Sequence, residues 1–357
     1  MKSVIKTYAA YLNDEKIRLE SSSGALFTAL AKDCISKNGV VYGVAMRKDC
    51  YGAEFVRVKT VEELAFIRGS KYIQASMGNT YKNVKDDLER GSYVLFTGTG
   101  CQVNGLKKFL RDKYENLVAV DIVCHGTPSP KVWREYVKYQ EDKYQGKMLY
   151  AGFRNKEQNH WEGFGMKEKI QGQHEIYLSR FKDPYFSFFV KNLSLRPSCY
   201  RCAAKEEKLS DISIADFWGI DEVAPDLNDD KGISLVITRT AKGQKVLNGI
   251  QDSLTMREVT YEQGIHQNSA EYMSHPCPEN RKQFFSDLGK MPFEQLANKY
   301  LYVPIWKRGA RKIKGIVKKY MGGKKIKNRG MYSQEYYCLK FVFTSNGGKD
   351  DSKVIYK

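Results

Sequence analysis

The feature that most constrains the fold is a strand, helix and strand pattern in residues 92–130. The apolar run Tyr93–Phe96 stops at Gly98-Thr99-Gly100, residues 102–113 carry apolar side chains at helical spacing, and residues 117–123 form a second apolar run. A strand–helix–strand unit of this length places its two strands in parallel. We therefore predict an α/β fold, mixed with α+β elements, around a core sheet that contains this βαβ unit.

A cysteine follows each of the two predicted strands, Cys101 after the first and Cys124 after the second. Open α/β sheets hold ligands at the carboxyl ends of their strands, so neighbouring strands would bring both thiols to one crevice. The Cys-x-x-Cys pair Cys199 and Cys202 could complete a four-thiolate site, although this spacing is shared by zinc sites, iron–sulfur sites and redox dithiols. The alternative is that Cys101 and Cys124 are ordinary buried thiols. The glycine-rich turns at both strand ends favour the ligand role.

The eight cysteines among 357 residues show no dense secreted pattern, and the sequence shows neither a signal peptide nor a long apolar segment. We therefore expect a cytoplasmic protein, in which clustered cysteines are ligands rather than disulfides. The net charge of +18 is uneven, because eleven Lys or Arg and no acidic residue lie between Lys307 and Arg329. The rest of the chain is only mildly basic, so nucleic acid is not the expected partner.

The basic tail has a helical pattern of its own, with the apolar residues of 306–320 on one face. A basic amphipathic helix binds an anionic membrane surface, which would place residues 305–329 at the inner face of the membrane. Gly309 and Gly315 weaken this helix. A solvated helix docked on the body and a disordered basic tail stay open as alternatives.

Two polar turns are candidate phosphate sites. Ser21–Gly24 precedes a helical pattern at 25–37, so we predict a serine N-cap whose free N–H groups could hold a phosphate, or a plain cap. The turn Arg68–Tyr72 carries two cations and an aromatic ring, which could clamp a phosphate and stack on a ring, or be a solvated loop. Asp216 ends a strand pattern and could orient a ligand or bond a neighbouring backbone group. Other strands are expected at 40–46, 54–59 and 232–238, and other helices at 79–90, 133–144 and 241–249. Residues 147–177 are expected to form strands, whose order we do not assign, and a mobile excursion.

Taken in order, several motifs resemble those of the coenzyme F-420 hydrogenase/dehydrogenase β-subunit family over roughly residues 8–260. Their order and number, rather than any one of them, carry the resemblance. The motifs are Ser22-Ser-Gly24-Ala25, Val41-Tyr-Gly43, Arg68-Gly-Ser-Lys-Tyr72, Phe96-Thr-Gly-Thr-Gly-Cys-Gln102, Asp121-Ile-Val-Cys-His-Gly126 with Pro128-Ser-Pro130, Arg196-Pro-Ser-Cys199 to Cys202, Ser210-Asp-Ile through Asp216-Phe-Trp-Gly219, and Lys231-Gly-Ile-Ser234.

The resemblance implies an oxidoreductase that binds FAD and a [4Fe–4S] cluster and passes electrons between iron–sulfur partners and a flavin or deazaflavin substrate. It implies that the cluster is held by Cys101, Cys124, Cys199 and Cys202. The residues that it places around the flavin are Ser22, Ser23, Gly24, Gly69, Ser70, Lys71, Tyr72, Gly98, Thr99 and Gly100. Lys71 would place positive charge near the flavin phosphates or ring. His125 would relay a proton, although a hydrogen-bonded loop histidine is an equal alternative.

On this basis we divide the chain into a flavin-binding part at 1–97, a part with the four-cysteine site at 98–300 and the basic tail at 301–357. Three departures from the family pattern matter. Gly100 replaces a usual proline and is expected to loosen the turn that positions Cys101. Ala25 replaces a common glycine and narrows the space for a phosphate, and Ala215 replaces another glycine before Asp216.

Many bacterial relatives begin with a ferredoxin-like segment that this sequence does not show, so we expect a separate ferredoxin or other iron–sulfur carrier as the electron partner, or a decayed redox role. The resemblance also extends to relatives in bacteria that lack the deazaflavin, which are found beside genes for cell-surface polysaccharides. The alternative function is therefore a zinc-stapled, membrane-associated accessory protein of polysaccharide biosynthesis, in which the four thiolates serve only the fold.

Overall fold

The computed structural model describes residues 5–111, 114–158 and 160–301. These residues belong to one compact unit, 1–302, and the predicted basic tail at 305–329 lies outside them. Within the described ranges, no helix has the length and apolar character needed to cross a bilayer.

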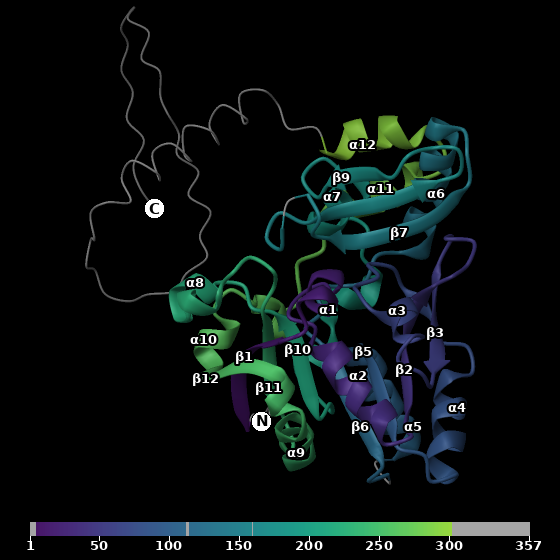
Figure 1. Cartoon of the computed structure of the whole chain (residues 1–357). Helices are drawn as coiled ribbons and strands as arrows, with labels where there is room; N and C mark the ends of the chain where they lie inside the picture. The colour runs from purple at the N-terminus through teal and green to yellow at the C-terminus, as the bar shows by residue number, and fades with distance from the viewer. Residues whose placement is uncertain (1–4, 112–113, 159, 302–357) are drawn as a thin grey trace, which may run out of the picture. The chain divides into compact units, whose positions relative to one another are not determined.

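A nine-stranded mixed sheet forms the centre of this unit (Figure 1). Four strands in its middle, β10, β6, β5 and β2, run parallel to one another, and antiparallel strands flank them on both sides. Strands from both predicted parts, 1–97 and 98–300, therefore share this sheet. In spatial order the strands are β12 (Leu254–Val259), β1 (Lys6–Leu12), β11 (Ser234–Thr238), β10 (Ile212–Asp216), β6 (Leu117–Ile122), β5 (Val94–Thr99), β2 (Val40–Met46), β3 (Ala53–Val58) and β4 (Ala75–Ser76).

The parallel strands begin with buried, mostly apolar residues because helices cover both of their faces. Successive residues of β5 alternate between two cores: Leu95 packs with the residues of α2, whereas Val94 and Phe96 pack with those of α4 and α5. This alternation explains why the sequence shows a continuous apolar run instead of a polar–apolar pattern. The helices around this sheet are α1 (Glu15–Glu20), α2 (Leu26–Ser36), α3 (Leu64–Ile67), α4 (Thr80–Glu89), α5 (Gly100–Leu110), α8 (Ile220–Val223), α9 (Ala241–Gly249) and α10 (Tyr261–Ile265).

A smaller three-stranded antiparallel sheet occupies the region around 147–177, where strands were predicted without an order. Its strands are β7 (Met148–Asn155), β8 (Gly165–Ile170) and β9 (Ile176–Ser179). It shares an aromatic core with α6 (Pro130–Tyr144), α7 (Pro184–Val190), α11 (Arg281–Asp287) and α12 (Phe293–Leu301) (Figure 1). Trp133 anchors this core, since its ring is fully buried and its indole N–H donates to the carbonyl of Cys50 at 2.7 Å. Short 3-10 turns complete the unit: η1 (Pro197–Arg201), η2 (Ala203–Lys205), η3 (Pro225–Leu227), η4 (Gln251–Ser253) and η5 (Ser269–Glu271).

A pair of buried carboxyl groups shares one tyrosine inside this second core. The hydroxyl of Tyr136 lies 2.6 Å from Glu168 Oε1 and 2.6 Å from Asp183 Oδ2. The hydroxyl has one proton to give, so the second short contact requires a proton on one of the carboxyl groups. Asp183 also accepts the N–H of Phe186 as the N-cap of α7, which favours its ionised form. Glu168 likewise accepts an N–H from Gln140 at 2.6 Å, but burial raises its pKa to about 7, against about 6 for Asp183, so Glu168 is the better candidate for the neutral carboxyl group.

We expect Glu168→Gln to weaken the pH dependence of stability. Burial raises the pKa of Glu168 from the usual 4.5 to about 7, so the folded state binds more protons than the unfolded state between these values. Stability is therefore lost as pH rises through that window, on the order of 2 kcal/mol for such a shift. Urea unfolding at about pH 5 and at about pH 8 should show that the free energy of unfolding falls less between these two pH values in the variant than in the wild type. The exposed Glu54→Gln is the control, and an unchanged loss in Glu168→Gln would contradict the assignment.

Candidate four-thiol site and adjoining polar turns

The two strand ends bring Cys101 and Cys124 to the same edge of the sheet, as predicted. β5 and β6 are parallel neighbours, and their last residues, Thr99 and Ile122, are paired in register. Cys101 is the second residue of α5, and Cys124 follows β6 by two residues. The loosening expected at Gly100 is not found, because Gly100 is the buried first residue of α5 and a capping box of Thr99 with Gln102 fixes the start of the helix.

The Cys-x-x-Cys pair is held against the loop that follows Cys124. The N–H of Arg196 donates to the carbonyl of Thr127 at 2.9 Å, and the N–H of Thr127 donates to the sulfur of Cys199 at 3.3 Å. The N–H of Cys202 donates to Ser274 Oγ at 3.0 Å, which fixes the other end of the pair. Segments far apart in the sequence are thereby joined at the sheet edge.

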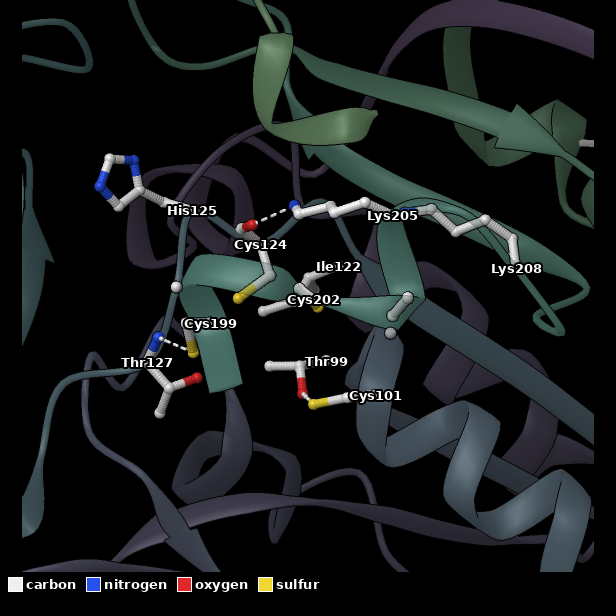
Figure 2. A pocket seen from close by; sticks show the side chains of 13 residues that line it. Thr99, Cys101, Ile122, Cys124, His125, Thr127, Cys199, Cys202, Lys205 and Lys208 are labelled. Carbon is white, nitrogen blue, oxygen red and sulfur yellow. Dashed lines mark hydrogen bonds between the residues drawn. The ribbon is translucent and has the colours of Figure 1, made fainter. Parts of the chain in front are cut away.

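All four cysteines line one pocket, which is partly open to solvent. Figure 2 shows their side chains around this pocket: Cys101 in α5, Cys124 in the loop after β6, Cys199 in η1 and Cys202 directly after η1. Among the described residues, no group of three or more His, Cys, Asp or Glu is arranged to hold a single metal ion. The other lining residues are Thr99, Gly100, Ile122, His125, Gly126, Thr127, Ala204, Lys205 and Lys208.

Burial controls the protonation of these thiols. It raises the pKa of Cys124 to about 11 and raises that of Cys199, so both thiols are protonated at neutral pH in the absence of a ligand. Neighbouring groups partly offset this effect, chiefly Lys205 at Cys124 and the N–H of Thr127 at Cys199. A bound metal centre would have to displace the thiol protons, so its binding would release protons.

Two lysines of the pocket wall, Lys205 and Lys208, were not predicted from the sequence. The ammonium group of Lys205 donates to the carbonyl of Cys124 at 2.5 Å, which Figure 2 marks. Burial lowers the pKa of Lys205, and a thiolate at Cys124 raises it again. Lys208 instead pairs with buried carboxylates. The sequence offered one hint, the dense lysines just after the Cys-x-x-Cys pair, but gave no sign that they were buried.

His125 lies in the pocket wall in a ring stack. Its imidazole stacks on His275 with centroids 3.9 Å apart, and its Nε2 lies 2.7 Å from Asn192 Oδ1. Burial, together with His275, lowers the pKa of His125 to about 4. The resting imidazole is therefore neutral at physiological pH, and the predicted proton relay would require only a brief protonation.

Two of the three turns predicted to surround a flavin lie side by side. The N–H of Ser70 donates to Ser22 Oγ at 2.8 Å, and its hydroxyl donates to the same atom at 3.0 Å, so the turns at Ser22–Gly24 and Gly69–Tyr72 are in contact. The third turn is elsewhere: Thr99 and Gly100 line the cysteine pocket, and Gly98 packs against Gln102 and Phe55.

The predicted serine cap of α2 is wrong. Ala25 is the N-cap, with φ of 65°, and it makes no side-chain capping hydrogen bond. The hydroxyl of Ser23 instead donates to the carbonyl of Ile233 at 2.7 Å, and the N–H of Gly24 donates to Ser234 Oγ at 3.0 Å. A side chain at Gly24 would lie 2.5 Å from the carbonyl oxygen of Ala10, so close packing on the sheet accounts for this glycine. The hydrogen-bonding groups of this turn therefore anchor the chain to the start of β11.

An excess of positive charge surrounds these two turns, and sequence reasoning missed most of it. Arg154, a buried residue of β7, donates to the carbonyl of Ser22 at 3.0 Å and to Asp216 Oδ1 at 2.7 Å. Asp216 therefore bonds side chains, rather than the neighbouring backbone group expected of it. The Nε atoms of Arg154 and Arg180 are buried and have no hydrogen-bond partner among the described residues. Arg180 lies over the ring of Phe164, 4.8 Å from its centroid.

Lys71 adds to this charge. Its ammonium group donates to the carbonyl of Arg68 at 2.8 Å. Desolvation, and to a smaller extent the charge of Arg68, lowers the pKa of Lys71 to about 7. An anion bound beside Lys71 would raise that pKa again, because it favours the charged form.

Aromatic rings connect the two regions. The ring of Tyr72 lies 4.9 Å from that of Phe189, and the ring of Phe189 lies 4.8 Å from that of His125, centroid to centroid. One ring of α7 therefore separates the polar turn at Gly69–Tyr72 from the wall of the cysteine pocket.

Comparisons with known proteins identify the family and the fold. A family model described as coenzyme F420 hydrogenase/dehydrogenase, beta subunit N-term, matches residues 7–81, and the model described as the C terminus of the same subunit matches residues 91–263. A chain in the structure titled "Xenon derivatization of the F420-reducing [NiFe] hydrogenase complex from Methanosarcina barkeri" aligns with a TM-score of 0.53 and 16% identity. The alignment covers 80% of this chain and 93% of that chain, and at this identity it concerns the fold alone. No curated protein matches the sequence.

Gly126→Ala should destabilise the loop that carries Cys124 and Thr127. Gly126 has φ of 151°, and a Cβ there would lie 2.7 Å from a methyl carbon of Leu195, so strain and overlap add. Gly91→Ala is the matched control, since Gly91 also has positive φ but nothing lies within 4 Å of its added Cβ. We expect urea unfolding to show a loss of about 1 kcal/mol for Gly91→Ala and about 2–4 kcal/mol for Gly126→Ala. Equal losses would mean that the contact with Leu195 is unimportant.

Proposed function

This chain belongs to the coenzyme F420 hydrogenase/dehydrogenase beta-subunit family, and we propose that it is a flavin- and [4Fe–4S]-dependent oxidoreductase. In this proposal it passes electrons between a ferredoxin-like iron–sulfur partner and a flavin, a deazaflavin or another organic substrate. The observation that carries the proposal is that Cys101, Cys124, Cys199 and Cys202, from three separate segments, line one pocket.

The family of the chain, and the lack of a single-ion arrangement among the described residues, favour a cluster over a single ion in this pocket. A zinc ion holds its thiolates about 2.3 Å from the metal, and no group of the described residues is arranged for one ion. A four-iron cluster is larger and keeps its four thiolates farther apart. It is also bound by cysteines alone, which matches a pocket with four thiols and no carboxylate in its lining. The alternative of a zinc-stapled accessory protein is therefore not supported.

The charge around the other two turns favours an anionic cofactor such as the diphosphate of FAD. Arg154 and Arg180 lie near Tyr72, with the carboxylates of Asp216 and Glu162 beside them, and Lys71 precedes Tyr72 in the same turn. Buried cations without sufficient counter-charge are costly, and a bound diphosphate would offset that cost. We assign Ser22, Ser23, Gly24, Gly69, Ser70, Lys71 and Tyr72 to this site, and place Gly98, Thr99 and Gly100 on the side of the cluster.

When bound, the iron–sulfur cluster would supply one-electron chemistry and the flavin would supply two-electron chemistry. The residues of the chain hold them and control their surroundings. The N–H of Thr127 donates to Cys199 and so orients one cluster ligand, while the rings of Tyr72, Phe189 and His125 fill the space between the sites and keep water out of it. Lys71 presents positive charge to the flavin.

Cys199→Ser should remove the iron. A serine hydroxyl is not a thiolate, so a cluster held by four cysteines loses one ligand and is expected to lose most of its roughly four irons per chain. Iron and acid-labile sulfide are measured after anaerobic purification of the full chain. Cys34→Ser is the matched control, because Cys34 is buried under the sheet and contacts the carbonyls of Val40 and Tyr93 instead of the pocket. Equal iron in Cys199→Ser and wild type, or a wild-type protein without iron, would end the proposal.

Lys71 should make flavin binding depend on pH. The pKa of Lys71 is about 7 and an anion raises it, so binding takes up a proton above pH 7 and weakens as pH rises. Flavin fluorescence titration should show affinity up to about tenfold lower at pH 8.5 than at pH 6 in the wild type. Lys71→Met should bind weakly at both values, and Lys71→Arg, which stays charged, should bind tightly at both. An unchanged pH dependence in Lys71→Met would contradict the role.

A further inference from the structure

Lys205 is a buried cation in the wall of the four-thiol pocket. It ends η2, and 6% of its surface is exposed. Its ammonium group donates to the carbonyl of Cys124 at 2.5 Å and to the carbonyl of Ala270. Figure 2 shows this side chain reaching from η2 to the backbone of a cysteine on the opposite wall.

Within the described part of the chain, no carboxylate lies within ion-pair distance of Lys205. The acidic groups nearby are already occupied by other cations. Asp121 and Glu271 lie 3.4 and 3.1 Å from the ammonium group of Lys208, and Glu271 also pairs with Arg239 at 2.5 Å. The hydroxyls of Ser210 and Ser213 donate to the remaining lone pairs of Asp121. Two carboxylates thus serve two other cations, and Lys205 adds a positive charge that these residues do not balance.

A buried ammonium group bonded only to carbonyl oxygens costs free energy unless an anion accompanies it. The pocket that Lys205 lines is the place where four thiolates would gather. An iron–sulfur cluster with four thiolate ligands is an anion, and its reduction adds one more negative charge. A fixed cation in a buried wall stabilises the more negative state, because the low dielectric leaves the interaction weakly screened.

We propose that Lys205 is the charge-compensating residue of the cluster and that its positive charge holds the reduction potential of the cluster up. This inference rests on the proposed function, since it presumes that a cluster fills the pocket. The step concerned would be a one-electron transfer, in which a reduced iron–sulfur partner loses one electron and the bound cluster would gain it. Lys205 acts on the potential and on cluster retention, and it is a positioning residue.

The test is a redox titration of the full chain under anaerobic conditions, followed by electron paramagnetic resonance and visible absorption. Lys205→Gln removes the charge but keeps an N–H donor, Lys205→Met removes both, and Lys205→Arg keeps the charge. We expect Lys205→Gln and Lys205→Met to shift the equilibrium at least tenfold toward the oxidised cluster. For a one-electron couple, this shift lowers the reduction potential by about 59 mV. Lys205→Arg should stay within half of that shift. Lys108→Gln is the control, because Lys108 is an exposed residue of α5 paired with Glu207, and it should leave the potential unchanged.

The outcomes separate this inference from the proposed function. A wild-type protein without iron and acid-labile sulfide overturns both. A wild-type cluster whose potential is unchanged in Lys205→Gln overturns the role of Lys205 alone. If Lys205→Gln and Lys205→Met fail to retain a cluster while Lys205→Arg retains it, charge compensation is supported through retention. If all three variants lose the cluster, Lys205 has only a structural role and the inference fails.

Discussion

The pairing of β5 with β6 is the constraint on which the rest of the site depends. Because the two strands are parallel and in register to Thr99 and Ile122, the residues that follow them leave the sheet at the same edge. The thiols of Cys101 and Cys124 reach one pocket for that reason alone. Parallel pairing in turn requires a crossover helix and burial on both faces. The apolar core around α2, α4 and α5 is therefore a precondition of the four-thiol site as well as a source of stability.

Both candidate sites carry buried positive charge beyond what their own carboxylates balance. Lys205 is buried in the wall of the cysteine pocket, and beside Tyr72 the buried Arg154, which pairs with Asp216, lies with the partly buried Arg180. A chain selected only for stability would avoid such residues, because each unpaired buried cation lowers the free energy of unfolding. Charge that the fold leaves unbalanced at two places marks where anionic cofactors would contribute to stability. Binding and folding are linked at such places, since a ligand that binds only the folded state stabilises it.

The elements around the βαβ unit could be predicted from the sequence because their signals are local. The strand at 40–46 and the helix at 241–249 have the predicted bounds, and α6 begins at Pro130, ahead of the predicted start. The order of the nine strands could not be predicted, since it depends on the long-range pairing of β1 with β11 and β12. Lys205 and Arg154 were missed for the same reason. A lysine in a short 3-10 turn and an arginine in a strand look like solvent-facing residues until the tertiary structure buries them.

The segment from α7 to η1 couples the two candidate sites mechanically. At its start, Phe189 packs between the rings of Tyr72 and His125. At its end, Cys199 accepts the N–H of Thr127, and the hydroxyl of Tyr200 donates to the carbonyl of Asn192 at 2.5 Å. A shift of this segment would therefore move a cluster ligand and the ring beside the flavin turn together. Since packed aromatic cores resist gradual deformation, the fold sets the separation of the two candidate sites.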